Sequence, residues 1–173
     1  MAAADTDRMF VAIWPPDMVV KEVTAAIPPD ATELRWQPAH RWHITLGFLG
    51  DRSARKELGP FETLQMPEAA PLRLDGAGTF GPVLWLGVDG EWLTDLARTV
   101  VTAFDLPKRR FRGHLTLARA RTAAARREEA QAARQLSGFT SSPWIPESLT
   151  LVRSTLGPSP AYEVIGRRRL LGP

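Results

Sequence analysis

The fold is decided by the stretch Arg112-Gly113-His114-Leu115-Thr116-Leu117-Ala118-Arg119, whose centre is repeated in Arg41-Trp42-His43-Ile44-Thr45-Leu46-Gly47. Both stretches contain His-x-Thr-Leu with an apolar x, and they hold two of the three histidines of the chain. Residues two apart in a strand point to the same face of a sheet. Each histidine is therefore expected to share one face with its threonine, while the apolar neighbours point to the other. This pattern predicts two matched strands that line one cleft.

The composition is that of an ordinary globular protein, since 44% of the 173 residues are hydrophobic and 24% are charged. We expect a single domain over residues 1–173, built from two pseudo-symmetric lobes. The absence of cysteine excludes disulfides and zinc sites built on thiolates. No apolar run approaches the roughly 20 residues of a membrane helix. Residues 1–7 lack the basic and apolar regions of a secretory signal, so we expect a disordered tail on a cytoplasmic protein.

The net charge of +3 is unevenly distributed along the chain. Residues 1–86 hold 8 Lys and Arg against 11 Asp and Glu (−3), whereas residues 87–173 hold 14 against 8 (+6). Arginine, which suits bidentate phosphate contacts, dominates the basic residues. One basic cluster, residues 108–112, runs directly into His114, which favours an anionic ligand there. For the other cluster, residues 167–169, a solvated surface is an equal alternative.

Hydrophobic periodicity and turn residues predict an alternation of strands and helices. The expected strands cover residues 9–14, 34–36, 42–49, 72–74, 83–88, 113–121, 148–156 and 162–170. The expected helices cover residues 17–27, 53–64, 90–104 and 123–136. Turns are expected at residues 76–81 and 157–160, because both segments are rich in glycine or proline.

The same order of secondary-structure elements occurs twice along the chain. An apolar strand leads to an amphipathic helix and then to a His-x-Thr-Leu strand, and the two histidines are 71 residues apart (114 − 43). We therefore predict an α+β fold that is duplicated and bilobal. Two mainly antiparallel sheets would flank a central cleft, with helices on the outside and the two motifs facing each other.

Two histidines on opposite sides of a cleft can supply one acid and one base to the same reacting group. A threonine beside each adds a hydroxyl donor for oxygens that gain negative charge, and nearby arginine would hold a phosphate. This set suits an in-line displacement at phosphorus. It needs neither a metal nor a cofactor, and no spacing of His, Asp or Glu in the sequence is typical of a metal site.

At this point the chain resembles the two-histidine (2H) phosphoesterases, most closely the RNA 2′,3′-cyclic phosphodiesterases, also called 2′-5′ RNA ligases. The matching stretches follow the order of the family along nearly the whole chain: residues 9–13, 43–50, 83–88, 111–119, 153–158 and 162–164. The resemblance implies hydrolysis of a 2′,3′-cyclic phosphate at an RNA end to a 2′-phosphate. In some members it also implies reversible 2′-5′ joining of RNA ends.

The resemblance also implies the roles of the site residues. His114 would be the proton acceptor for the attacking water and His43 the proton donor to the departing oxygen, while Thr45, Thr116 and Arg119 would hold the non-bridging oxygens. The family often has proline where this chain has Gly113. Strict alternation from His114 would turn Arg119 away from the cleft, so Arg119 reaches the phosphate only if the strand ends or bulges there.

Other residues have two interpretations. Phe10 and Phe111 are candidates for stacking on a base, with core packing as the alternative. Trp14, Trp42, Trp85 and Phe48 are expected in the core, although Phe48 is also a candidate for substrate binding. Arg112 is a candidate for RNA backbone contact or a solvated side chain. Tyr162 matches the family without a role that the sequence explains. His40 lacks the following threonine and is expected at the surface.

Three functions remain open on these residues. The first is the RNA cyclic phosphodiesterase, with RNA carrying a 2′,3′-cyclic phosphate end as its partner. The second is a phosphodiesterase with the same chemistry whose substrate is a small cyclic nucleotide or a 2′-5′ oligoadenylate. The third is a non-catalytic protein that binds RNA ends. We expect a monomer with no obligate protein partner.

Overall fold

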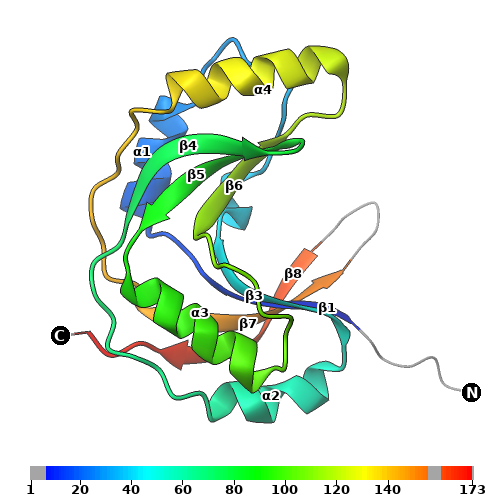
Figure 1. Cartoon of the computed structure of the whole chain (residues 1–173), viewed down its shortest axis with the longest axis vertical. Coiled ribbons are helices and arrows are strands. Elements are labelled where there is room, and N and C mark those ends of the chain that lie inside the picture. Colours follow the sequence, from blue (N-terminus) through cyan, green and yellow to red (C-terminus); the bar gives the residue numbers. More distant parts are fainter. Residues whose placement is uncertain (1–6, 156–160, 173) are drawn as a thin grey trace, which may run out of the picture.

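The computed structural model describes residues 7–155 and 161–172 (Figure 1). Its elements are β1 (Asp7–Ile13), α1 (Asp17–Ala26), β2 (Arg35–Trp36), a 3₁₀ turn η1 (Ala39–Arg41), β3 (Ile44–Arg52), α2 (Ala54–Glu62), β4 (Arg73–Phe80), β5 (Val83–Asp89), α3 (Trp92–Ala103), β6 (His114–Arg119), α4 (Ala123–Gln135), β7 (Ser148–Thr155) and β8 (Ala161–Arg169). Residues 1–6 of the expected tail and the expected turn at 157–160 lie outside the described residues, and Asp7 already belongs to β1.

The strands pair in the order β4-β5-β6-β3-β1-β7-β8, with β2 added beside β6, and the assigned pairs are antiparallel. The α+β class is thus confirmed. The two sheets expected from the sequence are continuous with each other, because Ile44 of β3 pairs with Leu115 of β6. That is the single register pair assigned between these two strands. Away from it the two halves of the sheet separate, as Figure 1 shows.

The strand order is symmetric about the β3–β6 junction, as the repeated plan predicts. Moving outward from the junction, β3 is matched by β6, β1 by β5, and β7 by β4, while β8 extends one edge. The leading strand of each repeat therefore lies next to its own histidine strand. The duplication places the two motifs side by side at the centre of the molecule.

Helices cover the faces of the sheet that point away from the histidines. The apolar stripe of α3 (Leu93, Leu96, Ala97 and Val100) is buried, as its spacing predicts. This helix packs on β3, although the two belong to different repeats. The approach is close at Gly47, where a Cβ atom would lie 2.7 Å from Cγ1 of Val100. This contact of α3 with β3 ties the two lobes into one core.

The other helices are also anchored by specific residues. Helix α4 packs on β4 and β5, and its first turn is capped by the Thr122 hydroxyl, which accepts a hydrogen bond from the backbone N–H of Ala125. Helix α2 lies against β8. There Arg168 donates to the carbonyl oxygens of Phe61 and Leu64, so this member of the second basic cluster supports the fold. No helix in the described ranges has the length and apolar character needed to cross a bilayer.

The turn expected at residues 76–81 is wrong, because β4 continues to Phe80 and turns only at Gly81 and Pro82. The glycines of this segment are explained by other features of the structure. Gly76 has φ +66 at a break in the β4–β5 register. Gly78 lies opposite Trp85, and a Cβ atom there would be within 2.4 Å of the indole ring. Strand β3 likewise runs past Gly50 to Arg52.

Candidate active site

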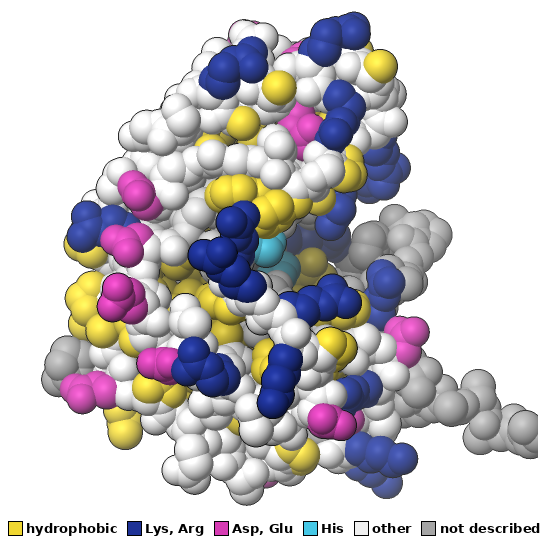
Figure 2. Space-filling model, viewed as in Figure 1, with side chains coloured by type: hydrophobic (Ala, Val, Ile, Leu, Met, Phe, Trp, Pro, Cys, Tyr) yellow, Lys and Arg dark blue, Asp and Glu magenta, His cyan; other side chains and the backbone are white. Residues whose placement is uncertain are grey.

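The junction between β3 and β6 sets the arrangement of the four motif side chains. Because Ile44 pairs with Leu115 in antiparallel register, His43 faces Thr116 and Thr45 faces His114 across the junction. The apolar residues of both motifs are buried, whereas the histidines and threonines are half-buried. The expected division of faces is therefore confirmed. Figure 2 shows histidine surface at the bottom of a hollow bordered by basic and apolar side chains.

Both histidine rings are fixed in the same way. Nδ1 of His43 lies 2.7 Å from the carbonyl oxygen of Arg41, and Nδ1 of His114 lies 2.8 Å from that of Arg112. A carbonyl oxygen only accepts hydrogen bonds, so Nδ1 carries a proton in each ring. The nitrogen that gains or loses a proton is then Nε2. In each case the accepting carbonyl is two residues before the histidine, a second repetition that the sequence pattern alone does not reveal.

His43 is enclosed by aromatic rings. Phe10 stacks on it at 4.7 Å between ring centroids, Trp14 is at 5.1 Å, and Tyr162 stands edge-on at 5.6 Å. Burial among these rings lowers the pKa of His43 below its ordinary value of 6.5. The hydrogen bond to Arg41 opposes this shift, and the charge of His114 adds a smaller lowering of the pKa. The last interaction means that the two rings act on each other electrostatically.

His114 stands in a more open setting. Phe80 lies edge-on at 5.2 Å and Trp85 at 6.4 Å. A pocket of about 500 Å³ opens beside it, with Phe111 and Arg112 also in its lining. Phe111 is half-buried and packs against the core, which fits the core alternative, although one part of it borders this pocket. The Arg112 side chain is exposed.

Bulges in the two motif strands decide where the residues after them point. Opposite β5 the register shifts between Leu84 and Trp85, because Thr116 pairs with Trp85 and Ala118 with Leu84. Leu117 is the extra residue, so both Leu117 and Ala118 are buried and the next residue, Arg119, returns to the face of His114. From the sequence, Arg119 could reach the phosphate only if the strand ended or bulged there, and the structure has a bulge at that position.

The same bulge occurs in β3, where Thr45 pairs with Ala12 and Gly47 with Val11. Phe48 thereby returns to the face of His43, opposite Phe10. Phe48 is 56% exposed as a residue, and the guanidinium carbon of Arg8 lies 5.8 Å from its ring centroid. The expectation that Phe48 lies in the core is therefore wrong, because the bulge turns it to the exposed face of the sheet, whereas Phe10 is only 4% exposed and already packs on His43.

Sequence reasoning missed part of the aromatic surroundings. Trp14 and Trp85 are half-buried against the histidines rather than in the core, while Trp42 is buried as expected. Phe80 was not singled out. A usable signal for Trp85 is its position in an apolar strand between buried Leu84 and Leu86, because alternation turns it to the opposite face. His40 is exposed as expected.

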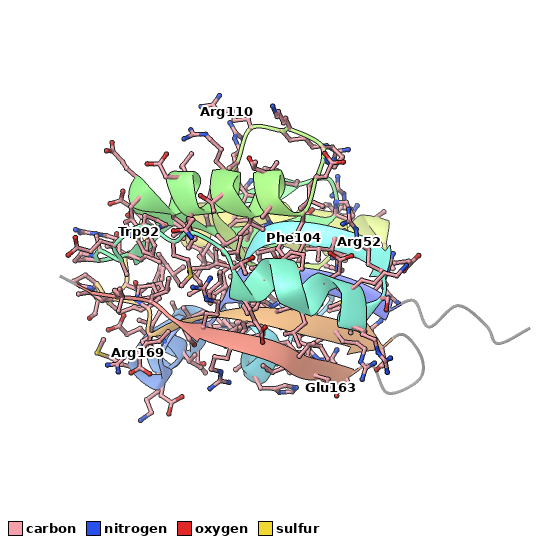
Figure 3. All side chains as sticks on the ribbon, turned by 90° about the horizontal axis from the view of Figure 1, so that it is seen from below. Arg52, Trp92, Phe104, Arg110, Glu163 and Arg169 are labelled. Atoms are coloured by element: carbon pink, nitrogen blue, oxygen red, sulfur yellow. The ribbon has the colours of Figure 1, made fainter. Side chains whose placement is uncertain are left out.

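The basic cluster before His114 is exposed. Residues 108–110 and Arg112 are all at the surface, and Figure 3 shows Arg110 on the loop after α3, projecting away from the body of the molecule. Among the described residues no group of three or more His, Asp or Glu side chains is arranged to hold a metal ion.

A two-lobed α+β fold with one His-x-Thr strand in each lobe is the arrangement that the resemblance to the two-histidine phosphoesterases implies. The family model described as 2′-5′ RNA ligase superfamily matches residues 15–158. The chain belongs to this superfamily.

Two curated relatives share the name RNA 2′,3′-cyclic phosphodiesterase. The protein from Geobacillus stearothermophilus is 35% identical over 152 residues, which are 79% of this chain and 48% of the relative. The protein from Thermus thermophilus is 31% identical over 196 aligned positions, covering 95% of this chain and 91% of the relative. The chain thus spans about half the length of the first relative and nearly all of the second.

Solved structures share the fold. Apo E. coli LigT superimposes with a TM-score of 0.77 at 24% identity, over 97% of this chain and 99% of that chain. TT0787 of Thermus thermophilus gives 0.74 at 25% identity, over 95% and 98%. E. coli LigT complexed with phosphate gives 0.74 at 25% identity, over 97% and 99%.

Proposed function

We propose that this protein is an RNA 2′,3′-cyclic phosphodiesterase that hydrolyses a terminal 2′,3′-cyclic phosphate to a 2′-phosphate. The observation that carries the proposal is the matched histidine pair, each ring held through Nδ1 by a carbonyl oxygen. Two fixed Nε2 atoms on neighbouring strands suit one proton acceptor and one proton donor for the same phosphorus. The shared name of the two curated relatives supports the choice of substrate.

In the proposed reaction, Nε2 of His114 takes a proton from water as its oxygen attacks phosphorus. The bond from phosphorus to the 3′-oxygen breaks, and Nε2 of His43 gives its proton to that oxygen. The hydroxyls of Thr45 and Thr116 and the guanidinium of Arg119 stabilise the non-bridging oxygens as their charge grows. The bulge after Thr116 supports the role of Arg119, because it returns this side chain to the face of His114.

His43 must hold a proton when the substrate reacts, although burial lowers its pKa in the empty site. The substrate itself opposes this effect, because the cyclic phosphate carries a negative charge beside the ring. An opposite charge at this distance favours the imidazolium form. Binding of the substrate and protonation of His43 are therefore coupled, and the neutral ring of the free protein becomes the proton donor in the complex.

The same groups would also join RNA ends if the nucleophile is changed. A 5′-hydroxyl of a second RNA in the position of the water would attack the cyclic phosphate with His114 as base, and the 3′-oxygen would leave with the proton of His43. The product is a 2′-5′ linkage. Joining of RNA ends is therefore a side activity of the proposed site.

The direct test uses a short RNA that ends in a 2′,3′-cyclic phosphate, incubated with the protein in the presence of EDTA. The product end is compared with synthetic 2′-phosphate and 3′-phosphate standards. We expect only the 2′-phosphate. A 3′-phosphate would contradict the assignment of the 3′-oxygen as the leaving group. An unchanged RNA end would contradict the proposed activity.

A further inference from the structure

Each histidine has a pocket near it. One, of about 800 Å³, opens beside His43 between β8, η1 and residues 144–148, and its lining includes Trp14 and Tyr162, which also contact the His43 ring. The other is the pocket of about 500 Å³ beside His114. Both volumes lie within the range of small-ligand sites. A phosphate bound at the histidines would therefore have a pocket large enough for a nucleoside near it.

The two pockets differ in charge. The pocket beside His43 has the side chains of Arg41 and Arg167 in its lining against one carboxylate, Glu147. The pocket beside His114 has two carboxylates, Asp75 and Asp89, against Arg112. An RNA strand brings a further phosphate with each nucleotide, so it is favoured in the first pocket and disfavoured in the second.

The pocket beside His43 also offers surface for a nucleobase. Val164 and Ile145 in its lining are 48% and 42% exposed, so both present apolar surface there. The Tyr162 ring lies beside them in the same lining, with the guanidinium of Arg41 5.2 Å from its centroid. Aromatic and apolar surface with cations at its border is the combination that binds single-stranded nucleic acid.

The strand register connects this pocket to the histidine motif. Thr45 lies opposite Ala12, Ala12 opposite Thr150, and Thr150 opposite Arg167. From Thr45 to Arg167 this row of residues crosses three strand spacings, which is about 14 Å between backbones. Its side chains lie on the sheet face that carries His43. Arg167 therefore points to the same side of the sheet as the motif.

We propose that the pocket beside His43 binds the terminal nucleoside of an RNA strand and that Arg167 contacts the phosphate on its 5′ side. This inference rests on the proposed function and adds a specificity-determining residue to it, Arg167, which would favour substrates with a phosphate on the 5′ side of the terminal nucleoside. It agrees with His43 as donor to the 3′-oxygen, because that oxygen belongs to the nucleoside in this pocket.

The test compares kcat/KM for three substrates: adenosine 2′,3′-cyclic phosphate, the same compound with a 5′-phosphate, and a diadenosine dinucleotide with a 2′,3′-cyclic phosphate end. The wild type is expected to prefer the second and third over the first by on the order of ten-fold or more, as for a charge-assisted contact. In Arg167→Ala the ratio of kcat/KM between the substrates with and without a 5′-phosphate should fall close to one. The matched control is Arg127→Ala, which removes an equal charge from the exposed face of α4 and should keep the preference.

The outcomes separate the two proposals. Equal kcat/KM for the three substrates in the wild type, or a preference that survives in Arg167→Ala, would overturn the pocket assignment while leaving the phosphodiesterase in place. Hydrolysis of none of the three by the wild type would overturn the proposed function and the pocket assignment with it.

Discussion

Ile44 and Leu115 lie opposite each other at the junction of the two lobes, and the residue before each of them is a catalytic candidate, His43 or His114. This one pair fixes the relative position of both motifs. Because the strands separate beyond it, the junction is also where the cleft begins. The core of the protein and its candidate site are therefore built on the same contact.

The first prediction concerns the pKa of His43. Burial against Phe10 and its neighbours lowers this pKa below 6.5, and a bound phosphate should raise it again. Both values can be read from the ring signals of His43 in NMR titrations, without and with inorganic phosphate. Phe10→Ala should hydrate the ring and move the pKa of the free protein upward. A pKa at or above 6.5 in the free wild type would contradict this description of the site.

The lowered pKa also predicts how stability depends on pH. His43 binds its proton more weakly in the folded than in the unfolded protein, so the unfolded state takes up more protons as the pH falls through about 6.5. The contribution of the neutral ring to stability is present above that pH and is lost below it. Urea unfolding at about pH 7.5 and pH 5.5 should show a smaller decrease in unfolding free energy for His43→Gln than for the wild type. Equal decreases would contradict the prediction.

A third prediction concerns the contact between α3 and β3. Gly47→Ala would place a Cβ atom 2.7 Å from Val100 and 3.0 Å from Leu106, so we expect a loss of about 1–3 kcal/mol in unfolding free energy, typical of overpacking. Val100→Ala in the same chain should recover part of it. Gly59→Ala is the control, because a Cβ atom in α2 meets nothing within 4 Å there. A neutral Gly47→Ala would contradict the close approach.

A fourth prediction tests Arg119. If the bulge at Leu117 brings this guanidinium to the phosphate, Arg119→Ala should lower kcat/KM about 10- to 100-fold, the range of a charge-assisted contact. Arg119→Lys should recover only part, since lysine lacks the bidentate geometry. Arg121, beyond the end of β6, is the control, and Arg121→Ala should stay near the wild type. Equal effects of the two alanine variants would remove Arg119 from the site.

Much of the fold could be predicted because the decisive signals are local. The His-x-Thr-Leu alternation predicts which face each motif residue occupies, and the stripe of α3 predicts its buried side. The glycines of β4 misled the prediction, because a turn and a close cross-strand contact both select glycine. The contact between Gly78 and Trp85 exists only once β4 and β5 are paired.

The details of the site depend on pairing that one strand does not encode. Leu117 is an extra residue only relative to β5, so the direction of Arg119 could be stated from sequence only as a condition. The carbonyl partners of the histidines depend on the backbone path before each strand. The positions of Trp14 and Trp85 beside the rings likewise follow from which strands become neighbours.

The acid and base roles of the histidines can be separated with a changed leaving group. Each of His43→Ala and His114→Ala should keep the fold and lose at least about 10²–10⁴-fold in turnover of an RNA 2′,3′-cyclic phosphate. Sulfur in place of the bridging 3′-oxygen leaves as a thiolate, which needs no proton from the enzyme because a thiol is far more acidic than an alcohol.

The measurement that tests the central claim most directly is therefore the rate of both variants on this sulfur substrate. We predict that His43→Ala recovers most of the wild-type rate, because only the proton donor has become unnecessary, and that His114→Ala stays inactive. Recovery of His114→Ala instead of His43→Ala would mean that His114 is the proton donor and His43 the proton acceptor. Wild-type turnover of the ordinary RNA end by either variant would contradict two-histidine catalysis itself.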